Sequence, residues 1–555
     1  MKKNPLKNLA VFMLLASLTM PAMQAKEASA ADAPTDNGGA TQAKSSIVRM
    51  ELAKIFSNWL RIPTLKHSTP ALELLEVKTG KVIYSYNGHR RFTPASTVKA
   101  ITCAAAFETL KGSYQYKTNL TAEGTIRGDV LEGNLVLSAS QDPTMGRADL
   151  INLANQAAKQ GPKNITGTLI LKGPAVKGMG FHPSWLVEDW GRHWMPVSSN
   201  LVVDRNITYT GNLVPGYKTL VAKSYDGKLF EYLLAAKGGP GWVYLDPVHR
   251  RQFIYQSNHP ETPKSVTLAV SNPDDFNRAL LQDLLEKRGF KFGGTAAPVN
   301  GGSVTPLASH SSQPLSLILK RTLNKSDNLY AQQILRTLGA RYLEEKNIAG
   351  GGENGSSTLE DYGILALNNW MRSVDIPAQE IILYDGCGLC RKNGVSPHSL
   401  NLVMKHMAAD PDLVPYLDLL RVNDESDKGR GSYKFKTGTM DGIRSISGIL
   451  TTSGNQRLAL TIMVNGHTPS IRNLSIAMSS LINQLRVIKN IGVELAPDPV
   501  ASPQDSAVTE NEETNVLVDT AALRAAPAKK AASARRSTAR TKTKTRSRSK
   551  KSHKR

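Results

Sequence analysis

The sequence predicts a mixed α/β (α+β) main domain that is interrupted by a long, mostly β insertion. Apolar helical patterns at 98–107 and 329–335, with strand-like runs at 432–435 and 443–451, indicate a domain of helices and strands. The segment 112–305 instead consists of short β-like runs separated by turn signals, for example 131–138, 167–172 and 265–270. At 555 residues, 40% of them hydrophobic, the chain has room for about three or four domains.

Three short motifs follow one another along the chain. They are Ser96-Thr97-Val98-Lys99, Ser326-Asp327-Asn328 and Lys436-Thr437-Gly438. Together they supply a nucleophilic hydroxyl, its proton acceptor, a second hydroxyl and a cation for a carboxylate, which is the set used by serine enzymes that bind penicillin. Each motif alone is a weak signal, and Ser-x-x-Lys arises by chance on the order of a few times in an ordinary chain. Their order and local context therefore carry the specificity.

The first motif is predicted to open a helix. Pro94 and Ala95 precede Ser96, and an alanine-rich apolar run follows it. Lys99 then lies on the same helix face as Ser96, within reach of its hydroxyl. If that face is buried, loss of solvation lowers the pKa of Lys99, and its neutral amine can accept the serine proton. An ordinary capping serine with a solvated lysine explains this motif equally well when it is taken alone.

The other two motifs are expected at a helix edge and in a β-hairpin. Ser326 can relay a proton and Asn328 can hold the substrate backbone, although a plain helix cap is the alternative. Lys436 and Thr437 are predicted on an edge strand, where they bind a terminal carboxylate while the substrate adds as a strand. Gly438 leaves room for that approach, and the N–H groups of Ser96 and Thr439 form the oxyanion hole.

With the three motifs in these predicted helix and strand surroundings, the chain resembles the class C low-molecular-mass penicillin-binding proteins. These are the D-alanyl-D-alanine carboxypeptidase/endopeptidases of the penicillin-binding protein 4 type. The resemblance covers roughly residues 50 to 485. Besides the three motifs, it depends on these landmarks: Ser140-Gln141-Asp142-Pro143-Thr144-Met145, Val203-Asp204-Arg205-Asn206, Tyr384-Asp385-Gly386-x-Gly388-Leu389-x-Arg391, Val395-Ser396-Pro397 and the run from Lys436 through Met440 to Ile449.

The resemblance implies a serine penicillin-recognising transpeptidase-like domain in two pieces, 45–111 and 306–495. Ser96 and Ser326 are 230 positions apart, and a structureless loop of that length is implausible, so the family's two extra β-rich domains are expected in 112–305. By resemblance, Asp142 and Met440 recognise a peptide side chain bearing an amino group. Asp142 is equally well explained as a turn residue before Pro143.

The resemblance further implies that the substrates are peptidoglycan peptides and that β-lactams acylate Ser96. The sequence does not rank carboxypeptidase against endopeptidase action. Two alternatives remain: a β-lactamase, and a non-catalytic envelope-binding protein that works through a basic tail.

Two cysteines depart from the family pattern, which usually has serine at both positions. Cys387 and Cys390 form Cys-Gly-Leu-Cys. In an oxidising compartment this pair favours a structural disulfide, with two free thiols as the second interpretation. A thioredoxin-like redox role lacks the βαβ surroundings that it needs. Cys103, in the helix after Ser96, is expected to be a core residue.

The N-terminus resembles a secretory signal. Lys2, Lys3 and Lys7 precede the apolar run 9–20, and small residues follow. Residues 1–30 are therefore predicted to be a signal peptide, cleaved after Ala25 or Ala30, with an uncleaved anchor as the alternative. Export to a bacterial periplasm is the expected outcome.

The high positive charge is concentrated at the C-terminus. Residues 521–555 hold 14 lysines and arginines and no acidic residue, which leaves +9 of the formal +23 for the rest of the chain. The composition of 496–555 predicts a disordered basic tail. Anionic envelope polymers are its expected partners, and a solvated tail without a dedicated partner is the alternative. No specific nucleic-acid readout is indicated elsewhere. Eleven histidines show no metal-ligand spacing, so neither a metal nor another cofactor is expected.

Overall fold

The protein is described by a computed structural model that covers most of residues 50–491. The segments left out within that range are 175–181, 187–188, 190–191, 196, 211–218, 224–228, 236–242, 247–250, 256–265, 271–272, 298–301, 349–356, 424–428 and 468–469. The predicted signal peptide, 1–30, and the predicted basic tail, 496–555, lie outside the described residues. Among the described helices, none combines the length and apolarity that crossing a bilayer requires.

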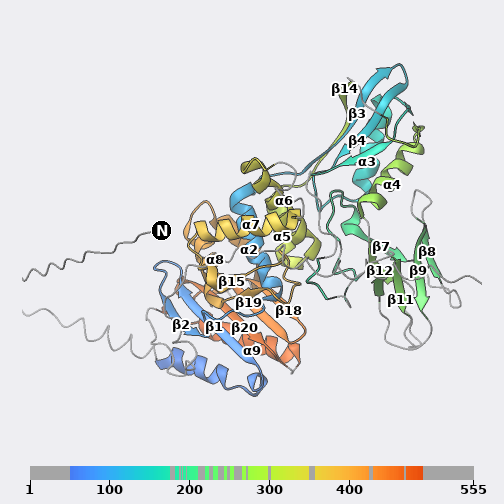
Figure 1. The fold of residues 1–555 in the computed structure, drawn as a ribbon. Helices are drawn as coiled ribbons and strands as arrows, with labels where there is room; N and C mark the ends of the chain where they lie inside the picture. The colour runs from blue at the N-terminus through green and yellow to red at the C-terminus, as the bar shows by residue number, and fades with distance from the viewer. Residues whose placement is uncertain are drawn as a thin grey trace, which may run out of the picture.

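The main domain is built on one antiparallel sheet of six strands in the order β17-β18-β19-β20-β1-β2. These strands are β17 (Arg421–Asn423), β18 (Ser432–Met440), β19 (Ile443–Thr451), β20 (Arg457–Asn465), β1 (Thr69–Glu76) and β2 (Val82–Tyr86). Strand β1 pairs with β20 along its whole length, so the two pieces of the domain share one sheet (Figure 1). The predicted hairpin around Lys436 is confirmed as β18 and β19.

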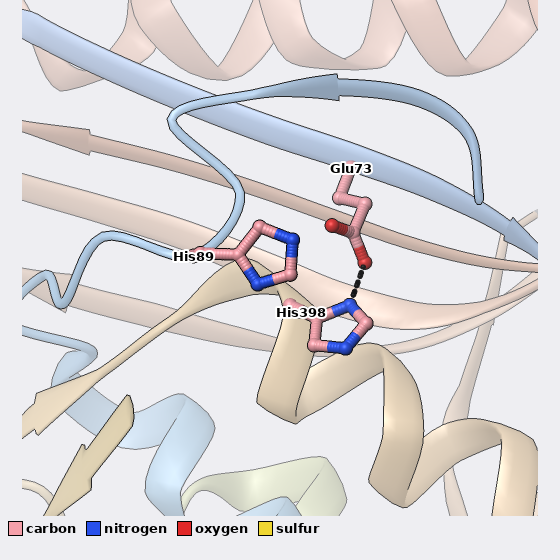
Figure 2. Close-up of side chains that lie close together, drawn as sticks. All are labelled: Glu73, His89 and His398. Atoms are coloured by element: carbon pink, nitrogen blue, oxygen red, sulfur yellow. Dashed lines mark hydrogen bonds and ion pairs between the residues drawn. The ribbon is translucent and has the colours of Figure 1, made fainter. Parts of the chain in front are cut away.

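Alternating side chains of the sheet face two apolar cores. On β1, Leu72 and Leu74 pack with a helix at 50–60 and with α9 (Ile471–Arg486), whereas Ala71 and Leu75 face the opposite way. The second face is covered by α2 (Val98–Leu110), α5 (Leu315–Lys325), α6 (Asn328–Glu345), α7 (Leu359–Ser373) and α8 (Pro397–Ala409). Helix α8 also contacts β1 through polar groups, because His398 Nδ1 lies 2.8 Å from Glu73 Oε1 (Figure 2).

The inserted region begins with its own sheet, in the order β13-β5-β4-β3-β14 with β6 beside β4. Its strands are β3 (Lys117–Arg127), β4 (Val130–Ser138), β5 (Asn164–Ile165), β6 (Leu169–Lys172), β13 (Lys291–Phe292) and β14 (Ser303–Ser311). Helices α3 (Arg147–Gln160) and α4 (Pro273–Glu286) pack on this sheet around a separate apolar core. The insertion is therefore less purely β than the sequence predicted.

A second group of strands lies within the insertion. A four-stranded sheet consists of β10 (Val243–Asp246), β11 (Arg251–Tyr255), β9 (Leu229–Ala235) and β8 (Thr219–Lys223). Strand β7 (Ile207–Thr210) pairs with β12 (Val266–Ala269) beside it. Figure 1 shows both groups on one side of the main domain.

The predicted inner boundary at 305/306 is wrong. Strand β14 pairs with β3 from Ser303 opposite Gly124 to Ser311 opposite Lys117. Because these backbone hydrogen bonds complete the sheet of the insertion, the insertion ends after Ser311. The main domain resumes with α5.

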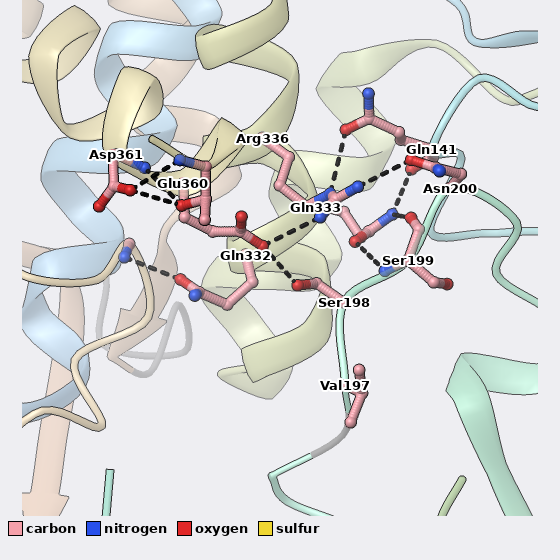
Figure 3. A network of polar contacts seen from close by, with 12 residues as sticks. Gln141, Val197, Ser198, Ser199, Asn200, Gln332, Gln333, Arg336, Glu360 and Asp361 are labelled. Carbon is pink, nitrogen blue, oxygen red and sulfur yellow. Dashed lines mark hydrogen bonds and ion pairs between the residues drawn. The ribbon is translucent and has the colours of Figure 1, made fainter. Parts of the chain in front are cut away.

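A buried polar network joins the insertion to helix α6 (Figure 3). Arg336, in the middle of α6, pairs with Glu360 of α7 at 3.0 Å, and both side chains are 1% exposed. The same guanidinium donates to Asn200 Oδ1 at 2.8 Å and to Gln141 Oε1 at 3.3 Å, two acceptors from the insertion. Gln333, on the same helix, donates to the backbone oxygens of Gln141 and Ser199. The network therefore attaches the insertion to the helix that begins at Asn328.

We expect the Arg336→Met variant to lose about 3–5 kcal/mol of stability, because it leaves the Glu360 carboxylate buried without its cation. The midpoint of urea unfolding, followed by fluorescence, measures the loss. Arg341→Met is the matched control: Arg341 lies on the same helix, but its pairs with Glu344 and Glu345 are exposed, so its change stays within about 0.5 kcal/mol. The double variant Arg336→Met/Glu360→Gln should recover part of the loss. Equal losses from Arg336→Met and Arg341→Met would contradict this account.

Candidate active site

Ser96 lies in a tight turn that its neighbours hold in place. The turn is the 3₁₀ helix Ala95–Thr97, directly before α2, and Ala95 has φ of 50°. An alanine in this left-handed region costs about 1–2 kcal/mol, so the surroundings must impose it. Two hydroxyls do so, since Thr97 Oγ1 and Ser445 Oγ donate to Pro94 O at 2.7 and 2.6 Å. The half-buried Ser96 is thereby presented at the start of the helix.

Lys99 is completely buried in the first turn of α2, three residues after the serine. Its Nζ lies 3.0 Å from Ser96 Oγ, 2.7 Å from Asn328 Oδ1 and 2.5 Å from the carbonyl oxygen of Cys387. Burial lowers the pKa of Lys99, against the opposing effect of nearby acidic groups. In its neutral form, Lys99 can donate to Asn328 and Cys387 and accept the proton of the Ser96 hydroxyl. The geometry is that of a general base acting on a nucleophile.

The second motif sits at the junction of two helices, as predicted. Helix α5 ends with Ser326 in the left-handed conformation, and Asp327 caps α6 by accepting from Tyr330 N. Lys436 Nζ donates to Ser326 Oγ at 2.9 Å and to Thr437 O at 2.5 Å. Lys436 is 1% exposed, and burial lowers its pKa well below the usual value, with the neighbouring charge of Lys99 as a second cause. Ser326 therefore contacts Lys436, and its hydroxyl can donate or accept a proton at this edge of the site.

The third motif abuts the nucleophile. A Cβ added to Gly438 would lie 2.5 Å from Pro94 O and 3.0 Å from Ser96 N, so only glycine fits there. Strand β18 is not a free edge strand, which corrects the prediction: β17 pairs with its first half, at Tyr433, Lys434 and Phe435. The second half, from Lys436 to Met440, extends beyond β17. The oxyanion-hole role of the Ser96 and Thr439 N–H groups stays a prediction, supported by this close approach.

The loop 384–391 packs against the turn that carries Ser96. The buried carboxylate of Asp385 accepts from the backbone N–H groups of Gly388 and Cys390, both at 2.7 Å, and from Trp185 Nε1 at 2.7 Å. Gly388 has φ of 82°, and a Cβ there would lie 2.0 Å from Ala95 O. The loop thus packs against the nucleophile turn while presenting the Cys387 carbonyl to Lys99.

The predicted disulfide between Cys387 and Cys390 is wrong in this structure, where all three described cysteines are free. Both residues instead belong to a small apolar cluster with Trp185, Met195 and Ala331. Burial raises the pKa of the Cys387 thiol well above its usual value and also raises that of Cys390. Protonated thiols in such surroundings pack as small apolar groups. Cys103 is buried in the main core, as expected, and burial raises its pKa to about 12.

Asp142 is not brought to the catalytic groups. Its side chain is buried, it accepts from the N–H and the hydroxyl of Thr144 at 2.8 and 2.6 Å, and His310 Nε2 lies 3.3 Å away. The alternative interpretation of Asp142, a turn residue before Pro143, agrees with this geometry. Met440 is the last residue of β18, the strand that carries Lys436 and Gly438, and it is partly exposed. Its role toward a substrate stays a prediction.

Sequence reasoning missed the contacts that the insertion makes with the active site. Asn328 Nδ2 donates to Trp194 O at 2.6 Å, which fixes the orientation of the amide whose oxygen faces Lys99. Arg205 pairs with the buried carboxylate of Asp327 at 2.8 Å. Arg205 belongs to a landmark of the family resemblance, and that landmark was the one sequence signal that could have indicated this contact.

Arg444 of the main domain was also missed. It lies opposite Thr439 on β19, contacts the Thr439 hydroxyl and adds a cation beside the site.

The comparison with protein families identifies the chain over most of its length. Residues 52–485 match the D-Ala-D-Ala carboxypeptidase 3 (S13) family. The chain belongs to this family. The resemblance stated from the motifs is therefore confirmed, and the family match spans both pieces of the main domain and the whole insertion.

Similar proteins and structures agree with this assignment. D-alanyl-D-alanine carboxypeptidase DacB of Haemophilus influenzae is 26% identical over 414 residues, which cover 71% of this chain and 84% of that protein. A D-alanyl-D-alanine carboxypeptidase of an Actinomadura species is 24% identical over 75% of this chain and 81% of that protein. The crystal structure of penicillin binding protein 4 from Haemophilus influenzae superposes with a TM-score of 0.63 at 23% identity, covering 79% of this chain and 98% of that chain. That likeness confirms the predicted fold.

We expect Lys99→Arg to slow the acylation of Ser96 by benzylpenicillin by about 10²–10⁴-fold, because a guanidinium stays protonated and cannot act as a base. In the unaltered protein the acylation rate should fall as the pH falls through the lowered pKa of Lys99, below its usual 10.5. Intact-mass measurements over time at several pH values give both results.

Lys434→Arg serves as the control, because Lys434 is on β18 but pairs with Asp418 near the surface. It should leave the rate unchanged. A Lys99→Arg variant that is acylated at the normal rate would show that Lys99 is not the base.

Proposed function

We propose that this protein is a serine D-alanyl-D-alanine carboxypeptidase/endopeptidase that cleaves peptidoglycan peptides through an acyl-enzyme on Ser96. The observation that carries the proposal is the 3.0 Å contact between Ser96 Oγ and the buried, solvent-shielded Nζ of Lys99. Membership of the D-Ala-D-Ala carboxypeptidase 3 (S13) family supplies the substrate class.

Acylation follows from the positions of the two lysines. The terminal carboxylate of the substrate docks at Lys436 and Thr437, and the preceding peptide carbonyl lies over Ser96. Lys99 takes the hydroxyl proton as Ser96 Oγ attacks the carbonyl carbon, and the N–H groups of Ser96 and Thr439 stabilise the oxyanion. When the C–N bond breaks, the Ser326 hydroxyl, 2.9 Å from Lys436 Nζ, gives its proton to the leaving amine and is reprotonated with the proton that Lys99 took from Ser96.

Deacylation uses the same base on a water molecule. Lys99, neutral again once its proton has moved to the leaving group, takes a proton from water as the water attacks the ester carbonyl. The bond between Ser96 Oγ and the acyl carbon then breaks, and Lys99 returns the proton to Ser96 Oγ, which restores the enzyme. When the leaving amine is a terminal D-alanine, the reaction is a carboxypeptidase cleavage; when the amine belongs to a cross-linked peptide, it is an endopeptidase cleavage.

Relatives support β-lactam binding as part of the proposal. A crystal structure of penicillin binding protein 4 from Haemophilus influenzae is described as a complex with a novel β-lactam, and it superposes on this chain with a TM-score of 0.60 at 24% identity. A β-lactam carries a reactive carbonyl next to a carboxylate, so the site that binds D-Ala-D-Ala peptides can bind it in the same orientation.

Location in the periplasm and tethering through the basic tail complete the proposal. The amino-terminal charges and the apolar run 9–20 support export. The 14 basic residues of 521–555 support attraction to anionic envelope polymers, whose strength falls as salt screens the charges.

Ser96→Ala should abolish both acylation and turnover. We expect the full chain to gain the mass of one benzylpenicillin and to release D-alanine from a peptide ending in D-Ala-D-Ala, while Ser96→Ala does neither, because it lacks the nucleophile. Ser309→Ala, at an exposed position of β14, is the control. Penicillin consumption without a lasting adduct would favour a β-lactamase. Absence of adduct, penicillin turnover and D-alanine release would favour a non-catalytic envelope protein.

Removing the tail should weaken envelope binding without changing catalysis. We expect the full chain to sediment with vesicles containing phosphatidylglycerol at low salt and a chain ending at residue 495 to stay in solution, because the vesicle charge attracts the tail. Acylation of Ser96 by benzylpenicillin should be equal in both. Equal vesicle binding would leave the tail as a solvated segment without this partner.

A further inference from the structure

Outside the catalytic centre, the fold brings together one glutamate and two histidines from distant parts of the chain. Glu73 lies in the middle of β1, His89 in the segment after β2, and His398 in the first turn of α8. One potential ligand atom from each residue lies within 4.8 Å of the other two. The two imidazole rings have centroids 4.4 Å apart (Figure 2). The cluster is the one such group of three found among the described residues.

The outer contacts of the cluster orient its ligand atoms. His89 Nδ1 lies 2.8 Å from Glu380 Oε1, which leaves Nε2 to face Glu73, as Figure 2 shows. Glu380 is in turn held by the hydroxyls of Ser396 and Ser399. A carboxylate on the far nitrogen of a metal-ligating histidine is the usual arrangement around protein metal sites, because it fixes the tautomer and the ring orientation.

Hydrogen bonds also orient the carboxylate of Glu73. Its carboxylate is completely buried, with Ser85 Oγ 3.1 Å from Oε2 and Asn401 Nδ2 3.3 Å from Oε1. His398 Nδ1 lies 2.8 Å from Glu73 Oε1. A proton bridges that pair when no metal is bound, and a metal would replace it. The opening faces solvent, because the side chain of His89 is 63% exposed.

We propose that Glu73, His89 and His398 form a binding site for one Zn²⁺ ion, with a water molecule as the fourth ligand. Two imidazoles and one carboxylate are a ligand set that zinc favours. Zinc–ligand distances of about 2.0–2.2 Å require the three atoms to approach to within about 3.5 Å of one another. The exposed His89 has the freedom to make that movement, while Glu73 and His398 already touch.

A bound ion would connect the nucleophile segment to α8. The segment that carries His89 continues through Phe92, which bridges to Val395, into the turn at Ser96. His398 N already donates to Gly88 O at 2.9 Å. The site is separate from the serine chemistry, so its test does not depend on the proposed function.

The experiment is a titration of the metal-free full chain with Zn²⁺ in competition with a chromophoric chelator. We expect the unaltered chain to bind one equivalent more than His89→Ala does, or to bind that equivalent at least tenfold more tightly. Glu380→Gln should weaken the same equivalent by about 10–100-fold, since it removes the charged acceptor from His89 Nδ1. Zinc binding should release a proton, and Mg²⁺, which prefers oxygen ligands, should not compete.

The matched control is His406→Gln. His406 pairs with Glu108 at 2.8 Å, as His398 does with Glu73, but it is not part of a three-residue ligand group. It should leave zinc binding unchanged. Circular dichroism and the midpoint of urea unfolding confirm that each variant is folded. Equal zinc stoichiometry and affinity in the unaltered chain and His89→Ala would overturn the proposal and leave the cluster as a network of ion pairs.

Discussion

The burial of the Lys99 amine is the constraint on which the rest of the active site depends. An ammonium group without solvent is costly unless it loses its proton or finds acceptors. Lys99 has three oxygen neighbours, from Ser96, Asn328 and the Cys387 carbonyl. Because they come from the 3₁₀ turn before α2, from the start of α6 and from the 384–391 loop, these three segments must meet at one point. The fold of the main domain is the arrangement that makes them meet.

The insertion contributes to this point although it supplies no group that reacts. Trp194 O orients the Asn328 amide, and Arg205 neutralises the buried carboxylate of Asp327 at the start of α6. Two turns further along the same helix, Arg336 joins α6 to Asn200 and Gln141. The insertion thus contacts α6 from its first residue to its middle. A displacement of the insertion would change the environment of Lys99 through Asn328.

Sequence patterns predicted the local elements well, because each depends on neighbours in the chain. The alanine-rich run after Ser96 and the turn between the strands of the hairpin are such cases. Features that depend on contacts between distant segments could not be predicted from the sequence. The insertion ends at Ser311 because β14 pairs with β3, and Asp142 turns inward because His310 lies beside it. Likewise, no spacing rule connects Glu73 with His398, which are neighbours only because α8 packs on β1.

The nucleophile turn is confined from two sides, and this confinement explains its unusual backbone. Gly388 and Gly438 approach residues 94–96 so closely that a Cβ at either position would collide with backbone atoms. Contacts of this kind offset the cost of the left-handed Ala95 and hold the Ser96 N–H group before a substrate arrives. A preformed oxyanion site needs no reorganisation during the reaction, which is where electrostatic stabilisation of a transition state is most effective. The segment that enters the turn is joined to the start of α8 and the residues before it, through the backbone pairs of Phe92 with Val395 and of Gly88 with His398. The ion pair of His89 with Glu380, or the metal ion proposed at His89, therefore acts on the segment that leads into Ser96.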